Sequence, residues 1–140
     1  MLTIIDREIK EDERKNILID IELILLKAGV PDNGFKRYSL AADEDRRIVG
    51  FISGLRDHKW LFLTDIWVKE THRRQGIGSQ LLKSIEDKIK ADGLEHIYLW
   101  TYGPDNQKFY EKNGYYQFAV FEDFYEVKGY HQIGYRKELY

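Results

Sequence analysis

The sequence predicts an α+β domain built on one mixed, mostly antiparallel sheet of about six or seven strands, flanked by helices. Three apolar segments between residues 35 and 68 are joined by short polar turns, which is typical of an antiparallel meander. The following segments alternate strand, helix and strand, which indicates a parallel pair joined by a crossover helix. The chain has 140 residues, 43% of them hydrophobic and 33% charged, so we expect a single domain over residues 1–140.

The N-terminal part is expected to hold a strand and a helix. Leu2–Ile5 is a short apolar run that predicts a strand. In Glu11–Ala28 aliphatic residues recur with the period of a helix, and Gly29 fits the position just after its end. The apolar stripe of this helix consists of Ile17, Ile21, Ile24, Leu25 and Ala28.

The meander is predicted from Phe35–Ala42, Ile48–Leu55 and Trp60–Val68, each rich in β-branched or aromatic residues. Polar runs at residues 43–46 and 57–59 supply the turns. Because these turns are short, consecutive strands are expected to pair antiparallel.

The second half is expected to alternate helices and strands. Ser79–Ala91 has the spacing of a helix with one buried stripe, and Asp92-Gly93 ends it. A short helix opens at Pro104 or Asp105 and runs through Lys112. Strands are predicted over Glu95–Thr101, Tyr115–Phe124 and Gln132–Leu139, the last two separated by the loop Tyr125–Tyr130.

An anion-binding loop is predicted between the strand that ends at Val68 and the next helix. A helix start directs unpaired backbone N–H groups and the positive end of its dipole at such a loop. Gly76 and Gly78 permit close approach of the backbone, and Arg73 and Arg74 match phosphate oxygens. The pattern therefore indicates a pyrophosphate site.

Two common nucleotide motifs do not fit this loop. A Walker A loop requires a lysine after its last glycine, and this loop has none. A dinucleotide fingerprint requires a third glycine, but Leu81 occupies that position. The following strand also lacks an acidic residue at the ribose spacing.

The pattern that does fit is Arg/Gln-x-x-Gly-x-Gly/Ala. Residues 73–78, Arg-Arg-Gln-Gly-Ile-Gly, resemble motif A of the GNAT superfamily, the acetyl-CoA-dependent N-acetyltransferases. Phe109–Tyr115 resembles the motif B of that family, a Phe-Tyr-x-Lys-x-Gly-Phe/Tyr run. The resemblance covers nearly the whole chain, is strongest from Trp60 to Tyr116, and is closest to small bacterial single-domain members. It implies the GNAT fold and acetyl-CoA as cosubstrate.

The resemblance also implies which residues contact the cofactor. The strand before motif A would bond pantetheine through its backbone at Ile66 and Val68, and the loop and helix start would hold the pyrophosphate. Many relatives place an asparagine at the position of Gly103, and Asn106 is expected to supply that amide here. The full set of expected contacts is Ile66, Trp67, Val68, Arg73, Arg74, Gln75, Gly76, Ile77, Gly78, Ser79, Asn106, Phe109, Tyr110 and Lys112.

The reaction that the resemblance implies is direct attack of a neutral amine on the thioester. Tyr110 matches the motif B tyrosine and is expected to protonate or stabilise the leaving thiolate; the alternative is a tyrosine packed under its helix. Asp65 is the candidate base, because burial would raise its pKa; the alternative is a carboxylate tied to the backbone or to a basic neighbour. His58 and His131 are further candidates for the base, and His72 is assigned to the phosphate loop.

Composition narrows the partners. The chain has no cysteine, which removes disulfides and an acyl-cysteine intermediate, and no histidine set has metal-ligand spacing. The net charge of −2 and the absence of a long apolar run argue against nucleic acid and membrane partners and favour a cytoplasmic protein. We expect a small-molecule, amino-acid or peptide amine as acceptor, and the resemblance implies a possible homodimer. A longer acyl-CoA donor and a non-catalytic CoA-binding module remain alternatives.

Overall fold

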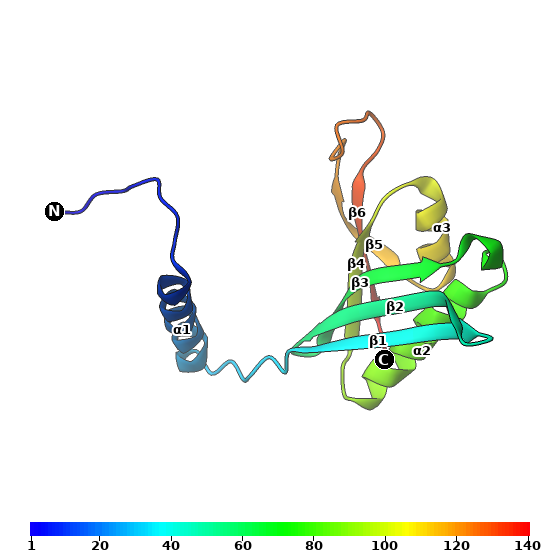
Figure 1. Ribbon diagram of the computed structural model, residues 1–140, viewed down its shortest axis with the longest axis horizontal. Coiled ribbons are helices and arrows are strands. Elements are labelled where there is room, and N and C mark those ends of the chain that lie inside the picture. The colour runs from blue at the N-terminus through cyan, green and yellow to red at the C-terminus, as the bar shows by residue number, and fades with distance from the viewer. The chain divides into compact units, whose positions relative to one another are not determined.

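The computed structural model describes residues 1–140, which form two compact units, Met1–Asp32 and Asn33–Tyr140 (Figure 1). No helix in either unit is long and apolar enough to cross a membrane.

The first unit holds helix α1, Glu11–Lys27. Its start is fixed by Glu13, whose carboxylate accepts the Lys10 backbone N–H at 3.0 Å and forms a two-fold hydrogen bond with the Arg7 guanidinium. It ends in a Schellman motif, in which Val30 N–H donates to the Leu25 carbonyl oxygen and Gly29 adopts a φ of +82°. The expected strand Leu2–Ile5 was wrong: the segment forms no ladder, because the first unit holds no strand to pair with its backbone.

The second unit is one sheet of six strands in the order β1-β2-β3-β4-β6-β5. All neighbours pair antiparallel except β3 and β4, which are parallel. The predicted mixed sheet is therefore confirmed, with six strands. Their bounds are Lys36–Glu44 (β1), Arg47–Asp57 (β2), Trp60–Val68 (β3), His96–Thr101 (β4), Tyr116–Phe121 (β5) and Gln132–Glu138 (β6).

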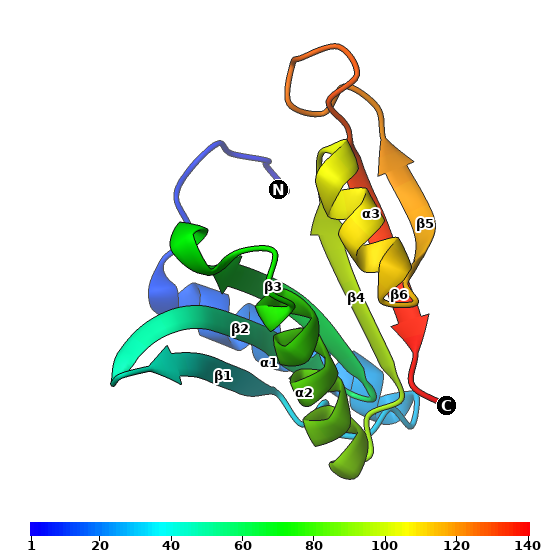
Figure 2. The same ribbon diagram turned by 90° about the vertical axis from the view of Figure 1, so that its right-hand side faces the viewer.

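Two helices cover one face of this sheet (Figures 1 and 2). Helix α2, Ile77–Ala91, contacts β1, β2 and β3, and helix α3, Pro104–Lys112, places Tyr110 against Tyr135 of β6. Helix-facing residues of the central strands, such as Ile52, Leu61 and Ile97, are fully buried, whereas the alternate residues of β3 and β4 form an aromatic opposite face. The centre of the core consists of Ile52, Leu61, Leu82, Ile85, Ile89, Leu94, Ile97, Leu99 and Tyr135.

Several element boundaries differ by a few residues from the sequence prediction, and two of the differences have a clear local cause. Helix α2 begins at Ile77 rather than Ser79, because Gly76 at its N-cap takes a φ of +83° and turns the chain directly into the helix. A 3₁₀ turn, Glu70–His72, precedes it. Tyr115 closes α3 instead of opening a strand, since its N–H donates to the Tyr110 carbonyl oxygen at 3.0 Å.

A buried carboxylate joins both helices and the last strand. Glu86 of α2 is only 6% exposed, yet both of its oxygens are bonded. One accepts the Tyr115 hydroxyl at 2.8 Å, and the other accepts Lys137 Nζ of β6 at 2.8 Å. Lys137 Nζ also donates to the carbonyl oxygen of Asn113, at the end of α3, at 3.0 Å. Because every partner is satisfied, the network can hold a charge inside the fold.

We expect Glu86→Ala to lower the free energy of unfolding by about 3 kcal/mol, because it leaves the Lys137 ammonium and the Tyr115 hydroxyl without their partner. Urea titration measures the change. Asp87→Ala on the same helix is the matched control: it breaks an exposed pair with Lys83 and should change stability by less than about 1 kcal/mol. Equal losses in the two variants would contradict a stabilising role for the buried network.

Candidate active site

The two parallel strands pair over only three residues and then separate. Pairing runs from Trp60↔His96 to Phe62↔Tyr98, although β3 continues to Val68 and β4 to Thr101. On the other side of β3, the register with β2 shifts so that Thr64 is an extra residue. Such a bulge bends the strand that carries it. The far half of β3 therefore lies away from β4.

The separation opens a cavity of about 380 Å³, which we call the strand cleft. Its walls come from the diverging ends of β3 and β4, with Tyr110 and Asn106 contributed by α3. The remaining lining residues are Phe51, Leu63, Thr64, Asp65, Ile66, Trp67, Leu99, Trp100, Thr101 and Tyr102. Backbone and side-chain polar groups thus meet aromatic walls in one cleft, which suits a small organic ligand.

Tyr110 presents a protonated hydroxyl to the strand cleft. Its ring packs against Phe109, Tyr115 and Tyr135, which fixes its orientation. The hydroxyl makes no hydrogen bond within the protein, and no solvent-sealed side-chain oxygen or nitrogen lacks a partner, so the hydroxyl opens into the cleft. Burial of the ring raises the pKa of Tyr110 to about 12. The group is therefore a hydrogen-bond donor at neutral pH.

Asp65 is the only carboxylate that lines the strand cleft. Its side chain is exposed and makes no hydrogen bond or ion pair with the protein. The expectation that Asp65 is a base relied on burial, and Asp65 is not buried. The alternative was a carboxylate tied to the backbone or to a basic neighbour, and Asp65 has no such partner. Asp65 is free to accept a proton or a hydrogen bond from a ligand or a water in the cleft.

The candidate histidines lie in other settings. His58 occupies the turn between β2 and β3 with a φ of +57°. His131 Nδ1 accepts the backbone N–H of Asp123 at 3.0 Å. His72 bonds Glu44 of β1 at 3.0 Å and so ties the loop after β3 to the first hairpin. None of the three lines the strand cleft.

A second cavity, of about 410 Å³, lies between β3 and the start of α2, and we call it the loop cavity. Arg74 and Gly76 both take positive φ, +62° and +83°, which turns the loop sharply into the helix. Gly76 makes no side-chain cap and the first helical turn has no acidic residue. The backbone N–H groups of Ile77 to Ser79 are thus left without intrahelical acceptors beside the cavity that they line.

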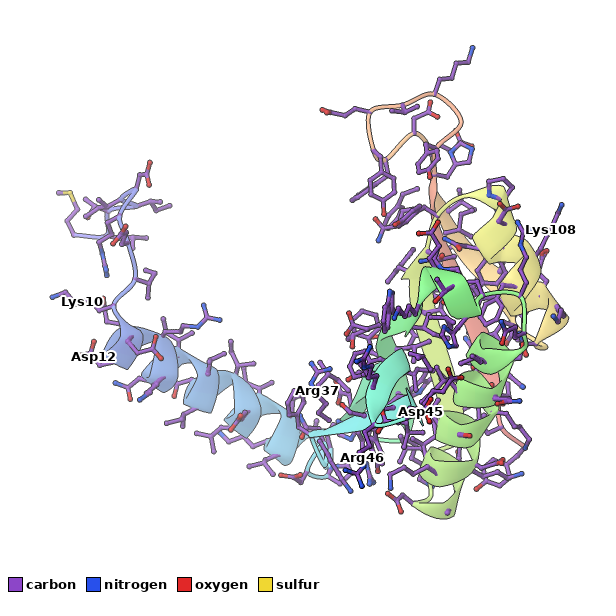
Figure 3. All side chains as sticks on the ribbon, turned by 45° about the vertical axis from the view of Figure 1, so that its right-hand side comes forward. Lys10, Asp12, Arg37, Asp45, Arg46 and Lys108 are labelled. Atoms are coloured by element: carbon purple, nitrogen blue, oxygen red, sulfur yellow. The ribbon has the colours of Figure 1, made fainter.

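The charge around the loop cavity is mostly positive. Arg73, Arg74 and Lys112 line it, and Asp105 is the one acidic residue among the lining groups. Arg73 Nε donates to the Val68 carbonyl oxygen at 2.9 Å, which holds the loop against the end of β3. By contrast, Lys108 of the same helix as Lys112 projects away from the sheet (Figure 3). The basic groups and the helix N-terminus together would favour a bound anion.

Helix α3 is fitted closely to the start of α2. A Cβ atom at Gly78 would lie 3.2 Å from the Phe109 ring, so the glycine lets the two helices approach. Asn113 Nδ2 donates to Ser79 Oγ at 3.3 Å. The amide of Asn106 donates to the Tyr102 carbonyl oxygen at 2.6 Å, so its nitrogen is engaged at the start of α3.

The two cavities adjoin, because Ile66, Trp67 and Asn106 line both. Of the residues expected to contact a cofactor, all line the loop cavity except Gln75, which lines neither cavity, and Tyr110, which lines the strand cleft. His72, which the sequence analysis assigned to the phosphate loop, also lines the loop cavity, whereas Asp105 was missed. It also missed the cleft walls from β2 and β4, whose aliphatic and aromatic residues are indistinguishable from core residues in the sequence.

Comparison with known proteins identifies the family. The model of the acetyltransferase (GNAT) family matches residues 7–115, which is more than half of the chain. The chain belongs to the GNAT family of acetyltransferases. Its fold, with a split sheet beside a basic loop and helix start, is the GNAT fold.

Three relatives of this GNAT protein are informative. Acetyltransferase Atu2258 of Agrobacterium fabrum is 30% identical over 73 residues, an alignment that covers 52% of this chain and 53%, about half, of that relative. An acetyltransferase from Bacillus cereus is 28% identical, with a TM-score of 0.77 over 94% of this chain and 95% of that one. An aminoglycoside 6′-N-acetyltransferase solved with coenzyme A is 19% identical, with a TM-score of 0.69 over 96% of each chain.

The raised pKa of Tyr110 predicts a loss of stability at high pH. The unfolded tyrosine ionises near its ordinary pKa of about 10, whereas the folded one holds its proton to about 12, so stability falls between pH 10 and 12. At pH 11 the loss amounts to about 1.4 kcal/mol, one pKa unit's worth. Urea unfolding at pH 8 and 11 should show a smaller loss for Tyr110→Phe than for the wild type. Tyr140→Phe, which alters an exposed tyrosine, should behave as wild type.

Proposed function

We propose that this GNAT protein transfers an acetyl group from acetyl-CoA to the primary amine of a small molecule, an amino acid or a peptide. The observation that carries the proposal is the adjoining pair of cavities. The loop cavity carries the positive charge that would suit a pyrophosphate. The adjoining strand cleft holds the hydroxyl of Tyr110, which has no hydrogen-bond partner in the protein. A relative of the same fold is solved with coenzyme A, which supports this cosubstrate.

The cofactor would bridge the two cavities. Its pyrophosphate would accept the backbone N–H groups of Ile77 to Ser79, with Arg74 and Lys112 adding charge. Its pantetheine arm would run along β3 past Ile66 and Trp67, where the strand has lost its neighbour and offers free backbone groups. The thioester would then reach the strand cleft beside Tyr110.

The chemistry is direct acyl transfer. The lone pair of a neutral amine attacks the thioester carbonyl carbon, the C–N bond forms, and the C–S bond breaks with its electron pair going to sulfur. The nitrogen gives up a proton, and the thiolate takes one from solvent. Asp65, which lines the cleft with no partner in the protein, would accept the amine proton directly or through water.

Tyr110 would act on the leaving sulfur mainly as a hydrogen-bond donor. A thiol of ordinary acidity has a pKa of about 8.5, so complete transfer of a proton from a phenol of pKa about 12 is uphill by about 5 kcal/mol. A hydrogen bond to the developing negative charge carries no such penalty. This hydrogen bond strengthens as negative charge accumulates on the sulfur. It therefore stabilises the transition state more than the bound substrate, which lowers the barrier to reaction.

Tyr110→Phe should lower kcat about tenfold to a hundredfold, because it removes a donor worth about 1.4–3 kcal/mol to the developing thiolate while keeping the ring packing. The KM for acetyl-CoA should stay within about twofold. Steady-state release of free thiol with an amine panel measures both. Unchanged kcat with the best amine would remove Tyr110 from the mechanism. Absence of turnover with every amine, together with tight CoA binding, would indicate a non-catalytic CoA-binding module instead.

Gly76→Ala should raise the Kd for CoA about fivefold. A Cβ at Gly76 meets no atom within 4 Å, so the substitution acts only by opposing the positive φ that aims the loop N–H groups. Isothermal titration with CoA measures the effect. Gly93→Ala is a close control, because Gly93 also has open space and a φ of +88° but lies at the other end of α2. Weaker CoA binding in both variants would show that general destabilisation, not the loop, is responsible.

A further inference from the structure

Three tyrosines form a pocket outside the two cavities already described. The pocket has a volume of about 430 Å³ and is lined by Tyr102, Tyr125, Val127 and Tyr130; we call it the tyrosine pocket. Tyr102 follows β4, and the other three belong to the loop between β5 and β6, which extends beyond the strands in Figure 1. Each tyrosine is 41–47% exposed, so the rings do not belong to the core.

Each of the three tyrosine rings contacts the other two. Their centroids lie 5.5 Å apart for Tyr102 and Tyr125, 5.7 Å for Tyr102 and Tyr130, and 6.1 Å for Tyr125 and Tyr130. None of the three hydroxyls hydrogen-bonds to the protein, and the rings are held by packing against one another and, for Tyr125, against Phe124. The loop itself is fixed by hydrogen bonds, including Gly129 N–H to Asp123 Oδ1 at 2.8 Å and Tyr130 N–H to the Val127 carbonyl oxygen at 3.0 Å.

The tyrosine pocket adjoins the strand cleft, since Tyr102 lines both. Tyr130 also packs its hydroxyl over Gly103, at the start of the helix that carries Tyr110. A ligand whose reactive end lies beside Tyr110 and Asp65 can therefore extend its other end into this pocket. No residue lines both the loop cavity and the tyrosine pocket, so a ligand in the tyrosine pocket would not compete with the cofactor pyrophosphate proposed for the loop cavity.

The chemistry of the pocket favours a positive charge. Tyrosine faces attract cations within about 6 Å of the ring centroid, and three tyrosine rings line this pocket. The same loop carries Glu122 and Glu126, which form no ion pair in the protein and give the loop a surplus of negative charge. The nitrogen that attacks the thioester must be neutral, so the cation that this pocket suits is a different nitrogen of the same molecule.

We propose that the tyrosine pocket binds a second, protonated or alkylated nitrogen of the acceptor, so that the preferred acceptors are molecules with two or more amino groups. This inference rests on the acetyl transfer proposed above and specifies its substrate class. The acceptor would enter with one amine toward Asp65 and its remaining ammonium among the tyrosine rings.

The first test compares α,ω-diaminoalkanes with alkylamines of the same chain length as acceptors. We expect kcat/KM to be at least tenfold higher for the best diamine than for its matched monoamine. Equal values for the two series, with acetyl-CoA consumed by both, would overturn the pocket's role and leave acetyl transfer intact. If no amine is acetylated, acetyl transfer itself fails, and the binding test below decides on the pocket.

The second test replaces one ring. Tyr125→Leu removes an aromatic face but keeps a bulky apolar side chain, and should lower the diamine-to-monoamine ratio of kcat/KM about tenfold. Tyr125→Phe keeps the face and should keep the ratio. Tyr140→Leu, which removes an exposed tyrosine outside the pocket, controls for the loss of a tyrosine as such. An unchanged ratio in Tyr125→Leu, or an equal drop in Tyr140→Leu, would overturn the proposal.

The third test measures binding without chemistry. Tetramethylammonium is titrated into the protein without acetyl-CoA, and tyrosine ring shifts are followed by NMR, with tert-butanol as the neutral molecule of similar shape. We expect saturable shifts of the Tyr125 and Tyr130 rings with the cation alone, lost in Tyr125→Leu. Equal shifts with both molecules would show an apolar site without charge preference, and no shifts would show no site; either result overturns the inference.

Discussion

The short contact between β3 and β4 is the constraint on which the functional half of this protein depends. β3 and β4 pair through three residues and then separate. Beyond that point, the backbone groups of β3 on the side of β4 have no strand partner. The separation depends on features of β3 itself and of β2, its neighbour on the other side. The extra residue Thr64 bends β3, and Gly54 lets β2 follow, since a Cβ there would lie 2.9 Å from the Leu61 side chain.

The helices convert that opening into two connected cavities. α2 stands on β1–β3 and presents its first turn to one side of the gap, and α3 brings Tyr110 and Asn106 to the other. Their relative position is set at short range, by Phe109 against Gly78 and by Asn113 on Ser79. Glu86 then ties the far ends of both helices to β6. The site is therefore positioned by packed elements rather than by free loops, which favours a fixed geometry between the loop cavity and the hydroxyl.

The parts of the fold that local chemistry determines were predictable. The meander, the bounds of β3, and glycine ends for the helices followed from apolar runs and turn residues, and the loop cavity from Arg74, Gly76 and the next helix. The strand cleft was harder to predict. Phe51, Leu99 and Trp100 line it only because two strands diverge, a long-range feature that leaves no local pattern. The expectation for Leu2–Ile5 failed for the same reason, because a strand requires a partner that its own residues do not encode.

The order of the strands also has a consequence for how the protein is made. β6 follows β5 in the chain, yet it lies between β4 and β5 and pairs with both. Until β6 has emerged from the ribosome, β5 has no neighbour in the sheet and Glu86 lacks its partner Lys137. The sheet beyond β4, including Tyr135 that packs against Tyr110, cannot form before then. The β1–β3 meander with α2 can assemble earlier from contacts closer in sequence. During synthesis the protein therefore passes through a stage in which an unpaired aromatic strand edge is exposed, and such an edge can pair with another chain.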